Sequence, residues 1–390
     1  MKVALVSFGH ADSVIPMAKA LSERLEVDLL FTFSLNKRKN NVINFENLKV
    51  KPGLQDEATT FKVLSEEIKA YSNGKFPIKL FIYKNLKLKS LTNWILSWKY
   101  AKILRKYDVI HLNGKNMNIL QLRIFIPFKK FVYTVHDLEN HTGEKAKNVL
   151  ARKFNDQILK SKSHVVIQNK ADYQTVKEAY PYNKQTIHFI PFGNLEIYSQ
   201  YNTENIKVPD SDVLFFGRIS PYKGIEYFVE AVQKLKNEFP AIRAIIAGSG
   251  KFYFDISAIE KEPTFTIINK FIQSDELVAL IKATKFVVCP YTDATQSGVA
   301  MTAFVFKKPV IATNAGGFRD VIIDGVNGYL IPVKDSIAIY EKAKSLLNDP
   351  KLLKEMSENI VEQGKTGDFA WNTIAKNYEE VYKKALSIDN

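Results

Sequence analysis

The chain has 390 residues, enough for two domains of ordinary size, and 46% of them are hydrophobic, which suffices for two cores. Its single cysteine excludes an intramolecular disulfide, and no apolar run is long enough to span a bilayer. The formal net charge of +14 predicts an anionic partner, which could be nucleic acid, an anionic lipid surface or a phosphorylated substrate.

The N-terminus predicts a strand, a glycine turn and a helix. Residues 2–7 are mostly apolar and indicate a first strand rather than a signal peptide, because a long apolar region and a cleavage site are missing. Gly9 follows, and residues 14–25 have helical periodicity. We interpret Ser13 as the N-cap of this helix, since serine is a preferred capping residue.

Residues 75–107 form a basic stretch that has no Asp or Glu and carries aromatic residues such as Trp94 and Trp98. Basic and aromatic residues on amphipathic segments suit the surface of an anionic bilayer, and they also suit nucleic acid. An ordinary pair of helices with basic solvated faces gives the same pattern. Of these three interpretations, we favour binding to the surface of an anionic membrane.

Three histidines lie in or just after two expected strands. His111 is inside a strand, where a hydrogen-bonded core histidine is the usual case. His136 and Asp137 end the next strand, and ligands bind at the carboxyl ends of parallel strands. His141 and Glu144 follow in the sequence; they could contact the acceptor, or they could be ordinary residues of a surface loop. These residues match no metal-binding spacing, so we expect no metal.

Residues 194–211 are polar and lack periodicity, which predicts a linker between two domains. The Asp-Ser-Asp tripeptide at 210–212 precedes a strand, whereas an Asp-x-Asp metal clamp ends one. We therefore interpret it as a solvated loop.

The most informative stretch follows this linker. Residues 213–216 predict a buried strand that ends at Gly217, and residues 225–239 predict an amphipathic helix. Arg218 and Lys223 lie between them, at the place where ligands bind in a parallel sheet. A forked guanidinium, a compact ammonium and the free N–H groups of a helix start suit a diphosphate. The alternative is two solvated cations on a tight turn.

A second glycine turn, Gly248-Ser249-Gly250, follows the expected strand 244–247. It could be half of a dinucleotide fingerprint, but Tyr253 stands where the third glycine is required, so NAD binding is disfavoured. Cys289 lies in an apolar strand, where a buried inert thiol is expected.

The order of these motifs resembles the large retaining family 4 of the GT-B glycosyltransferases. The resemblance rests on the Gly-Arg to Lys-Gly loop at 217–224, on Pro-Val-Ile-Ala at 309–312 followed by Gly316-Gly317, and on Asp-Gly-x-x-Gly at 324–328. It extends over most of residues 187–335 and is weaker over the first half.

The resemblance implies an α/β fold of two Rossmann-like domains facing a cleft. Residues 1–193 would form the acceptor-side domain and residues 212–370 the nucleotide-sugar domain, with a C-terminal helix (371–390) crossing back to the first. It implies transfer of a sugar, with retention, from a nucleotide-diphosphate sugar to a glycan or lipid-linked acceptor in cell-surface polysaccharide synthesis. We expect a cytoplasmic protein that docks on the membrane through residues 75–107, with no cofactor, metal or nucleic acid.

Carried onto this sequence, the resemblance assigns catalysis to Arg218, Lys223 and His136. It places donor contacts at Gly9, Gly217, Gly248, Lys270, Ile272, Asp293, Gln296, Ser297, Gly298, Val299 and Thr302. Acceptor-side contacts fall at His10, Asp12, Asp137 and His141.

One motif departs from the family. Its usual Glu-x7-Glu pair falls on Ala294 and Thr302, with Asp293 one residue early, and Thr-Gln-Ser-Gly at 295–298 resembles a subset of the family. The missing carboxylates keep open a non-catalytic protein that binds a nucleotide sugar. The charge alone would permit a nucleic-acid-binding protein, but no recognised motif supports one.

Overall fold

The computed structural model describes residues 1–36, 43, 45–46, 48–114, 116, 118–126, 131–136, 138, 155–161, 163–294 and 298–387. The chain divides into two compact units. The first consists of Met1–Glu139, Asn148–Gly193 and Trp371–Asn390, and the described part of the second is Asn194–Ala294 and Gly298–Ala370. Among the described residues, none of the helices has both the length and the apolar character of a membrane span.

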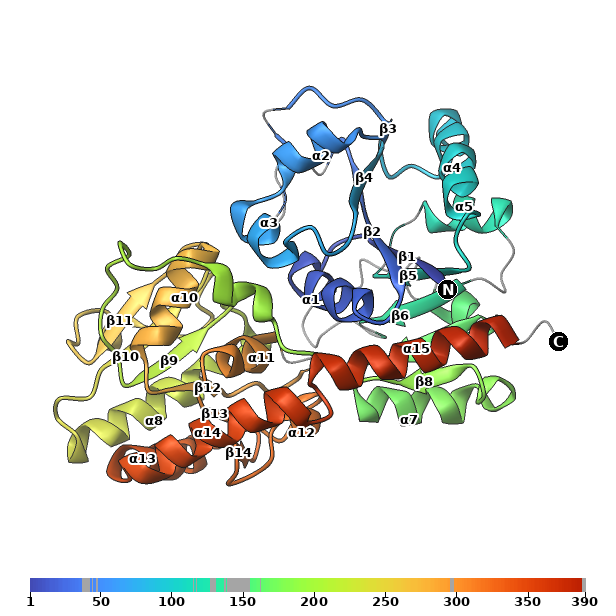
Figure 1. The fold of residues 1–390 in the computed structure, drawn as a ribbon. Helices are drawn as coiled ribbons and strands as arrows, with labels where there is room; N and C mark the ends of the chain where they lie inside the picture. The colour runs from blue at the N-terminus through green and yellow to red at the C-terminus, as the bar shows by residue number, and fades with distance from the viewer. Residues whose placement is uncertain are drawn as a thin grey trace. The chain divides into compact units, whose positions relative to one another are not determined.

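The first unit contains an eight-stranded sheet in the order β3-β4-β2-β1-β5-β6-β7-β8, in which only β3 is antiparallel to its neighbour (Figure 1). Its strands are β1 (Lys2–Ser7), β2 (Glu26–Ser34), β3 (Gly53–Leu54), β4 (Ile78–Tyr83), β5 (Val109–Asn113), β6 (Phe131–Val135), β7 (His164–Ile167) and β8 (Ile187–Phe189). Its helices are α1 (Ala11–Ser22), α2 (Glu57–Val63), α3 (Glu66–Ser72), α4 (Leu91–Leu104), α5 (Ile119–Phe125), α7 (Lys170–Ala179) and α15 (Trp371–Ser387).

The first helix begins earlier than its sequence predicts, at Ala11 instead of Val14. The interpretation of Ser13 as the N-cap is therefore wrong. His10 is the N-cap, in the left-handed region with φ 51°, and the Ser13 hydroxyl donates to the His10 carbonyl oxygen at 3.0 Å. Histidine is not a usual capping residue, so the sequence carries no signal for this start.

The last helix, α15, packs on the first unit against α1, β5 and β6 (Figure 1), as the resemblance implies. Its Tyr382 hydroxyl lies 2.7 Å from Nδ1 of His111, whose Nε2 lies 2.8 Å from the Thr134 hydroxyl. His111 is fully buried, so its prediction as a structural core histidine is confirmed. Burial lowers the pKa of His111 to about 3.

This buried histidine should make the first unit sensitive to acid. The unfolded chain takes up a proton near the ordinary pKa of 6.5, whereas native His111 stays neutral until about pH 3. The free energy of unfolding should therefore fall as the pH decreases from about 6.5 towards about 3. Denaturant titrations across this range should show the fall. His111→Gln should flatten the slope by up to about 1.4 kcal/mol per pH unit, and an unchanged slope would contradict the assignment.

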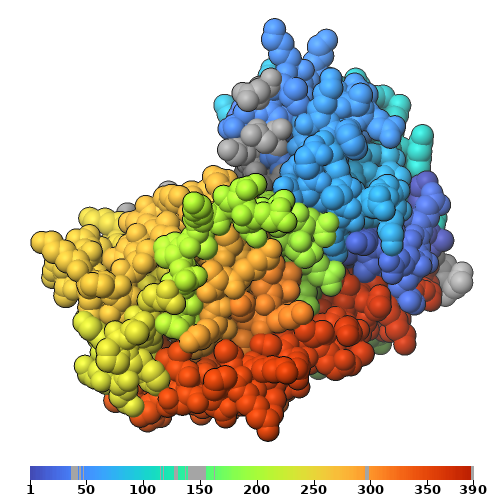
Figure 2. All heavy atoms as spheres, turned by 60° about the vertical axis from the view of Figure 1, so that its left-hand side comes forward, coloured from blue at the N-terminus to red at the C-terminus, as the bar shows by residue number. Residues whose placement is uncertain are grey.

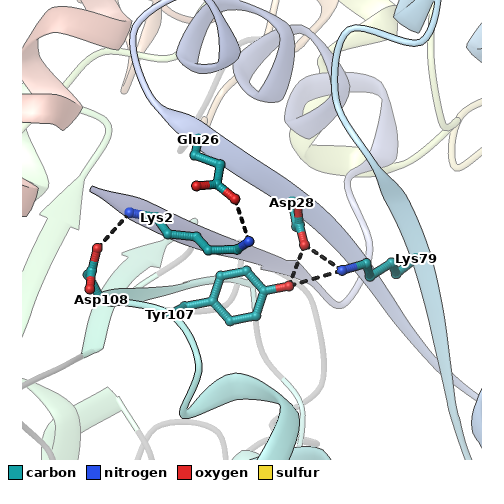
Figure 3. Close-up of polar contacts among 6 residues, drawn as sticks. All are labelled: Lys2, Glu26, Asp28, Lys79, Tyr107 and Asp108. Carbon is teal, nitrogen blue, oxygen red and sulfur yellow. Dashed lines mark hydrogen bonds and ion pairs between the residues drawn. The ribbon is translucent and has the colours of Figure 1, made fainter.

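A polar cluster joins four strands or strand ends at the amino edge of this sheet (Figure 3). The buried Asp28 carboxylate pairs with Lys79 and accepts a hydrogen bond from the Tyr107 hydroxyl. Lys2 pairs with Glu26, and its backbone N–H donates to Asp108 at 2.7 Å. Burial, followed by the bond to Asp28, raises the pKa of Tyr107. Lys79 of the basic stretch thus has an acidic partner that is distant in sequence.

The second unit contains a six-stranded parallel sheet in the order β11-β10-β9-β12-β13-β14. Its strands are β9 (Val213–Phe216), β10 (Ala244–Ala247), β11 (Phe265–Ile268), β12 (Phe286–Cys289), β13 (Val310–Thr313) and β14 (Gly328–Ile331). Its helices are α8 (Ile225–Glu238), α9 (Ser257–Glu260), α10 (Ser274–Ala283), α11 (Gly298–Val305), α12 (Phe318–Val321), α13 (Ser336–Asn348) and α14 (Pro350–Thr366). Numbered from β9, this strand order is 3-2-1-4-5-6, the Rossmann order.

The segment before β9 packs on helices of the second unit. It contains the 3-10 helix η3 (Glu196–Gln200), which packs on α10 and α11, and Figure 2 shows this light green segment lying across their orange surface. The sequence predicted that Asp212 lies in a solvated loop, but its side chain is buried. Its buried carboxylate accepts the Arg243 backbone N–H at 2.9 Å and pairs with Lys285 at 2.8 Å. It therefore links neighbouring chain segments.

Candidate functional site

The strand order of the second unit fixes where a ligand can bind. In a doubly wound sheet the order reverses at one point, and ligands occupy the crevice outside the carboxyl ends of the two strands there. Here those strands are β9 and β12. The loop after β9 carries Arg218 and Lys223, and the loop after β12 leads through Tyr291 and Asp293 to α11.

Backbone contacts hold the loop after β9, residues 217–224, in one conformation. The Thr292 N–H donates to the Tyr222 carbonyl oxygen at 2.8 Å, which ties it to the loop after β12. The Ile219 N–H donates to the Ser249 carbonyl oxygen at 3.0 Å, which ties it to the loop after β10. The short 3-10 helix η4 (Pro221–Lys223) then leads into α8. These hydrogen bonds therefore connect the loops that follow β9, β10 and β12.

Two glycines make this close approach feasible. Gly224 has φ 62°, and a Cβ added there would lie 2.1 Å from the Pro290 carbonyl oxygen. A Cβ added to Gly248 would lie 1.8 Å from the Gly217 carbonyl oxygen. A side chain at either position would push the fastened loops apart.

Lys223 has an unusual environment for a lysine. Its Nζ lies 3.6 Å from the centre of the Tyr291 ring, a distance typical of a cation–π contact. The pKa of Lys223 is lowered to about 7, mainly by burial; Cys289 acts in the opposite direction, and the neighbouring charge of Arg218 adds to the lowering. Arg218 itself is exposed. The loop thus presents one accessible cation and one partly buried cation that can lose its proton near neutrality.

Cys289 ends β12 beneath this loop and is fully buried. Burial raises the pKa of its thiol to about 12, so the thiolate does not form near neutral pH. The prediction of a buried, inert thiol is confirmed.

The other donor-side residues occupy different places. Gly298 and Val299 begin α11 and are half-buried, whereas the buried Thr302 hydroxyl donates to the Gly298 carbonyl oxygen at 2.7 Å. Lys270 and Ile272 follow the edge strand β11, and the Lys270 ammonium pairs with Glu276 at 3.0 Å. Gln296 and Ser297 lie outside the described residues.

The first unit has its own reversal of strand order, between β1 and β5. Gly9 and His10 follow β1, and the His10 ring stacks on that of His136, with centroids 4.0 Å apart and planes at 20°. His136 is 5% exposed, and its Nε2 lies 2.8 Å from the Asn113 side-chain oxygen. A Cβ on Gly114 would lie 3.6 Å from the His10 ring. The structure thus brings together His10 and His136, which lie far apart in sequence.

Asn113 and Gly114 are members of this group that sequence reasoning missed. The signal was available, because they end the strand beside β1, at the carboxyl edge. Asp12 instead accepts the backbone N–H of Ser13 at 3.1 Å in the first turn of α1. Asp137 and His141 lie outside the described residues.

Two Rossmann-like α/β units in one chain define the GT-B class of fold, and solved structures share it. Alr3699/HepE from Anabaena, in complex with UDP, aligns with a TM-score of 0.66 at 19% identity, over 98% of this chain and 100% of that one. Sucrose-phosphate synthase from Thermosynechococcus elongatus aligns with a TM-score of 0.66 at 18% identity, over 100% of both chains.

Sequence matches identify the enzyme class. Residues 199–363 match the family "Glycosyl transferases group 1". The chain is 26% identical over 310 residues to D-inositol 3-phosphate glycosyltransferase of Corynebacterium diphtheriae, which is 73% of this chain and 72% of that protein. It is 29% identical over 173 residues to the uncharacterized glycosyltransferase MJ1178 of Methanocaldococcus jannaschii, a match that spans 44% of this chain and about half (47%) of the relative. Residues 199–363 therefore form a group 1 glycosyltransferase domain, and the chain is a glycosyltransferase.

Proposed function

We propose that this glycosyltransferase moves a sugar, with retention, from a nucleotide-diphosphate sugar to a glycan or lipid-linked acceptor in cell-surface polysaccharide synthesis. The observation that carries the proposal is the loop 217–224, which presents Arg218 and Lys223 at the reversal of strand order in the second unit. Structures with the same fold support the donor class, since HepE was solved with UDP and with UDP-glucose.

In this proposal, catalysis depends mainly on stabilising the leaving group. As the bond between sugar and phosphate breaks, negative charge grows on the diphosphate. The guanidinium of Arg218 and the ammonium of Lys223 neutralise it, with help from the first N–H groups of α11. Gly217 and Gly248 let the backbone approach the phosphates.

The remaining residues have supporting roles in the same proposal. Asp293 lies one residue before the position of the family's sugar-binding carboxylate, and it contacts the donor sugar. Lys270 and Ile272 lie near the base of the nucleotide. In the first unit, His136 acts at the sugar, while His10 and Asp12 lie on the acceptor side. The stacking of His10 on His136 supports placing these two histidines at one site.

A panel of ligands tests the donor class. Thermal unfolding of the full chain is measured with UDP, GDP, ADP and the corresponding sugar nucleotides, because a ligand that binds only the native state raises the melting temperature. We expect one base to give the largest shift, and we expect slow release of free sugar from its sugar nucleotide without acceptor. Binding without any hydrolysis would favour the non-catalytic alternative, and no shift with any nucleotide would contradict the proposal.

We also propose that α4 and α5 dock on an anionic membrane surface. Figure 1 shows the two helices side by side, and they carry exposed apolar residues at Leu91, Ile95, Trp98 and Ile124. The α4 residues lie at helical spacing on one face, and Lys102 Nζ lies 3.6 Å from the centre of the Trp98 ring. Exposed lysines flank this face, so its apolar residues and charges together match an anionic bilayer.

Two lysines of the basic stretch have acidic partners. Lys75 pairs with Glu23 at 3.3 Å and Lys79 pairs with Asp28, so neither adds an uncompensated charge. The relevant cations are those on and around α4, such as Lys99 and Lys102.

The double variant Ile95→Ser/Trp98→Ser should therefore lose most of its binding to anionic vesicles at low salt. Removing two exposed apolar side chains takes away their insertion into the bilayer, at about 1.5–3 kcal/mol for each fully inserted side chain. Sedimentation with vesicles measures the loss. Ile323→Ser, at an exposed apolar residue of the second unit, is the matched control and should bind like wild type. Wild-type protein that stays in the supernatant, or that binds DNA instead, would overturn this docking surface.

A further inference from the structure

A separate pocket of about 520 Å³ lies in the first unit, at the amino ends of β7 and β8. Among its lining residues are His164, Tyr173, Lys184, Thr186, His188 and Lys384. Its volume is within the range of small-molecule sites, which is about 300–1,000 Å³. The pocket lies at the opposite edge of the sheet from Gly9, Gly114 and His136, which follow carboxyl ends.

The strand register explains why two histidines meet here. His164 is in register with Val132 and His111, and His188 with Val166 and Thr134. Residues in register on parallel strands point to the same face, and the face that carries His111 and Thr134 is covered by α15. His164 and His188 therefore lie on the face under α15, where Nδ1 of His164 is 2.8 Å from Nε2 of His188.

This imidazole pair is held neutral by its surroundings. Hydrogen bonding between two ring nitrogens needs one donor and one acceptor, so the bond cannot persist when both rings are charged. Burial, together with the charge of Lys384, lowers the pKa of both histidines to about 4. Lys177 of α7, together with His164 itself, adds to the effect on His188. His164 is only 3% exposed.

The charged side chains that line the pocket, among the described residues, are both lysines. Lys184 from the loop before β8 and Lys384 from α15 line it, and Lys177 acts on it from α7. None of the lining residues in the described part of the chain is an Asp or a Glu. Clustered cations in a hollow with buried walls create a positive potential that an anion can neutralise.

We propose that this pocket binds the phosphate group of a small soluble phosphomonoester, at a second site that does not depend on the sugar donor. Lys184 and Lys384 supply the charge, and His188 supplies an N–H donor at the rim of the sheet. A phosphate has the size, charge and acceptor oxygens that such a set recognises.

Binding should be coupled to protonation. A phosphate beside the imidazoles favours their charged form, so it should raise the titration midpoint of His188 from its low value in the free protein. Among the described residues, the groups that face this pair are Tyr173 and Lys177 from α7, Lys184 from the loop and Lys384 from α15, and none of these is an acid. The contribution of His188 to phosphate affinity should therefore increase as the pH falls towards its titration midpoint of about 4 in the free protein.

Thermal unfolding of the full chain tests the proposal with inorganic phosphate and with glycerol 3-phosphate, each against chloride at the same ionic strength. We expect the melting temperature to rise with either phosphate. The double variant Lys184→Gln/Lys384→Gln should weaken the affinity by at least about tenfold, since a hydrogen bond to a charged group contributes roughly 1.5–3 kcal/mol. Both lysines are exposed, so the fold should persist.

Two control variants locate the binding. Lys376→Gln removes an exposed charge of α15 outside the pocket, and Arg218→Gln removes the cation proposed for the donor site. Both should keep the phosphate shift, and the His188 imidazole signal in NMR should titrate at higher pH when phosphate is present. The proposal is overturned if neither phosphate stabilises the wild type, if the double variant keeps the full shift, or if only Arg218→Gln loses it. The last result would overturn the second phosphate site but not the proposed donor site.

Discussion

Replacing Arg218 by alanine is expected to lower turnover with a saturating donor by about 10²- to 10³-fold, the range measured when a charge-stabilising donor is removed from an active site. Arg218 lies in a loop that is tied by backbone bonds to the loops after β10 and β12, so the backbone that carries it is held in place before substrate binds. An interaction that strengthens as the leaving diphosphate gains charge acts on kcat rather than on donor binding alone.

The measurement is the initial rate of sugar transfer or of donor hydrolysis at saturating sugar nucleotide. Arg243→Ala is the matched control, because Arg243 is an exposed arginine of the same unit that pairs with Asp210 at 3.3 Å near the amino edge of the sheet. It should keep a rate within about twofold of wild type, as expected for a surface ion pair. A near-normal rate for Arg218→Ala would remove this residue from the catalytic machinery.

The affinity for a nucleoside diphosphate is expected to fall by up to about tenfold for each pH unit above 7. In the free protein, burial lowers the pKa of Lys223 to about 7, whereas a bound diphosphate stabilises its charged form and raises that pKa. Above pH 7 the ligand must therefore bind with uptake of a proton. Below pH 7 Lys223 is already charged and this dependence should vanish.

Calorimetric titrations between about pH 6 and 9, in two buffers of different ionisation enthalpy, give both the affinity and the number of protons taken up. Lys223→Met should weaken binding at pH 6 and abolish the proton uptake, because the variant has no group to titrate. An affinity that stays constant across this range in the wild type would show that Lys223 does not contact the diphosphate.

Local pattern was sufficient to predict much of the second unit. The run from Val213 to Gly217 and the helix that follows it are contiguous in sequence, so the strand, loop and helix are visible without knowledge of the fold. The position of Arg218 and Lys223 at a strand's carboxyl end follows from this order alone. The pairing of β9 with β12 does not, because strand order depends on packing between distant segments.

Contacts between distant residues account for most of the differences from the sequence predictions. The basic stretch contains no acid, yet Lys79 finds Asp28 on a neighbouring strand. Asp212 resembles a loop residue in its local sequence, yet it is buried by contacts with Arg243 and Lys285. The stacking of His10 on His136 depends on the register of β1, β5 and β6, which periodicity cannot supply.

The most direct test of the central claim compares a nucleoside diphosphate with its nucleoside, using the base selected by the ligand panel. Both are titrated into the wild type and into Arg218→Ala/Lys223→Met at about pH 6.5, where Lys223 is charged. If loop 217–224 holds the diphosphate, the double variant should bind the diphosphate at least about 100-fold more weakly and the nucleoside equally well, since two charge-assisted contacts are lost. Equal affinity of the two proteins for the diphosphate would contradict the account.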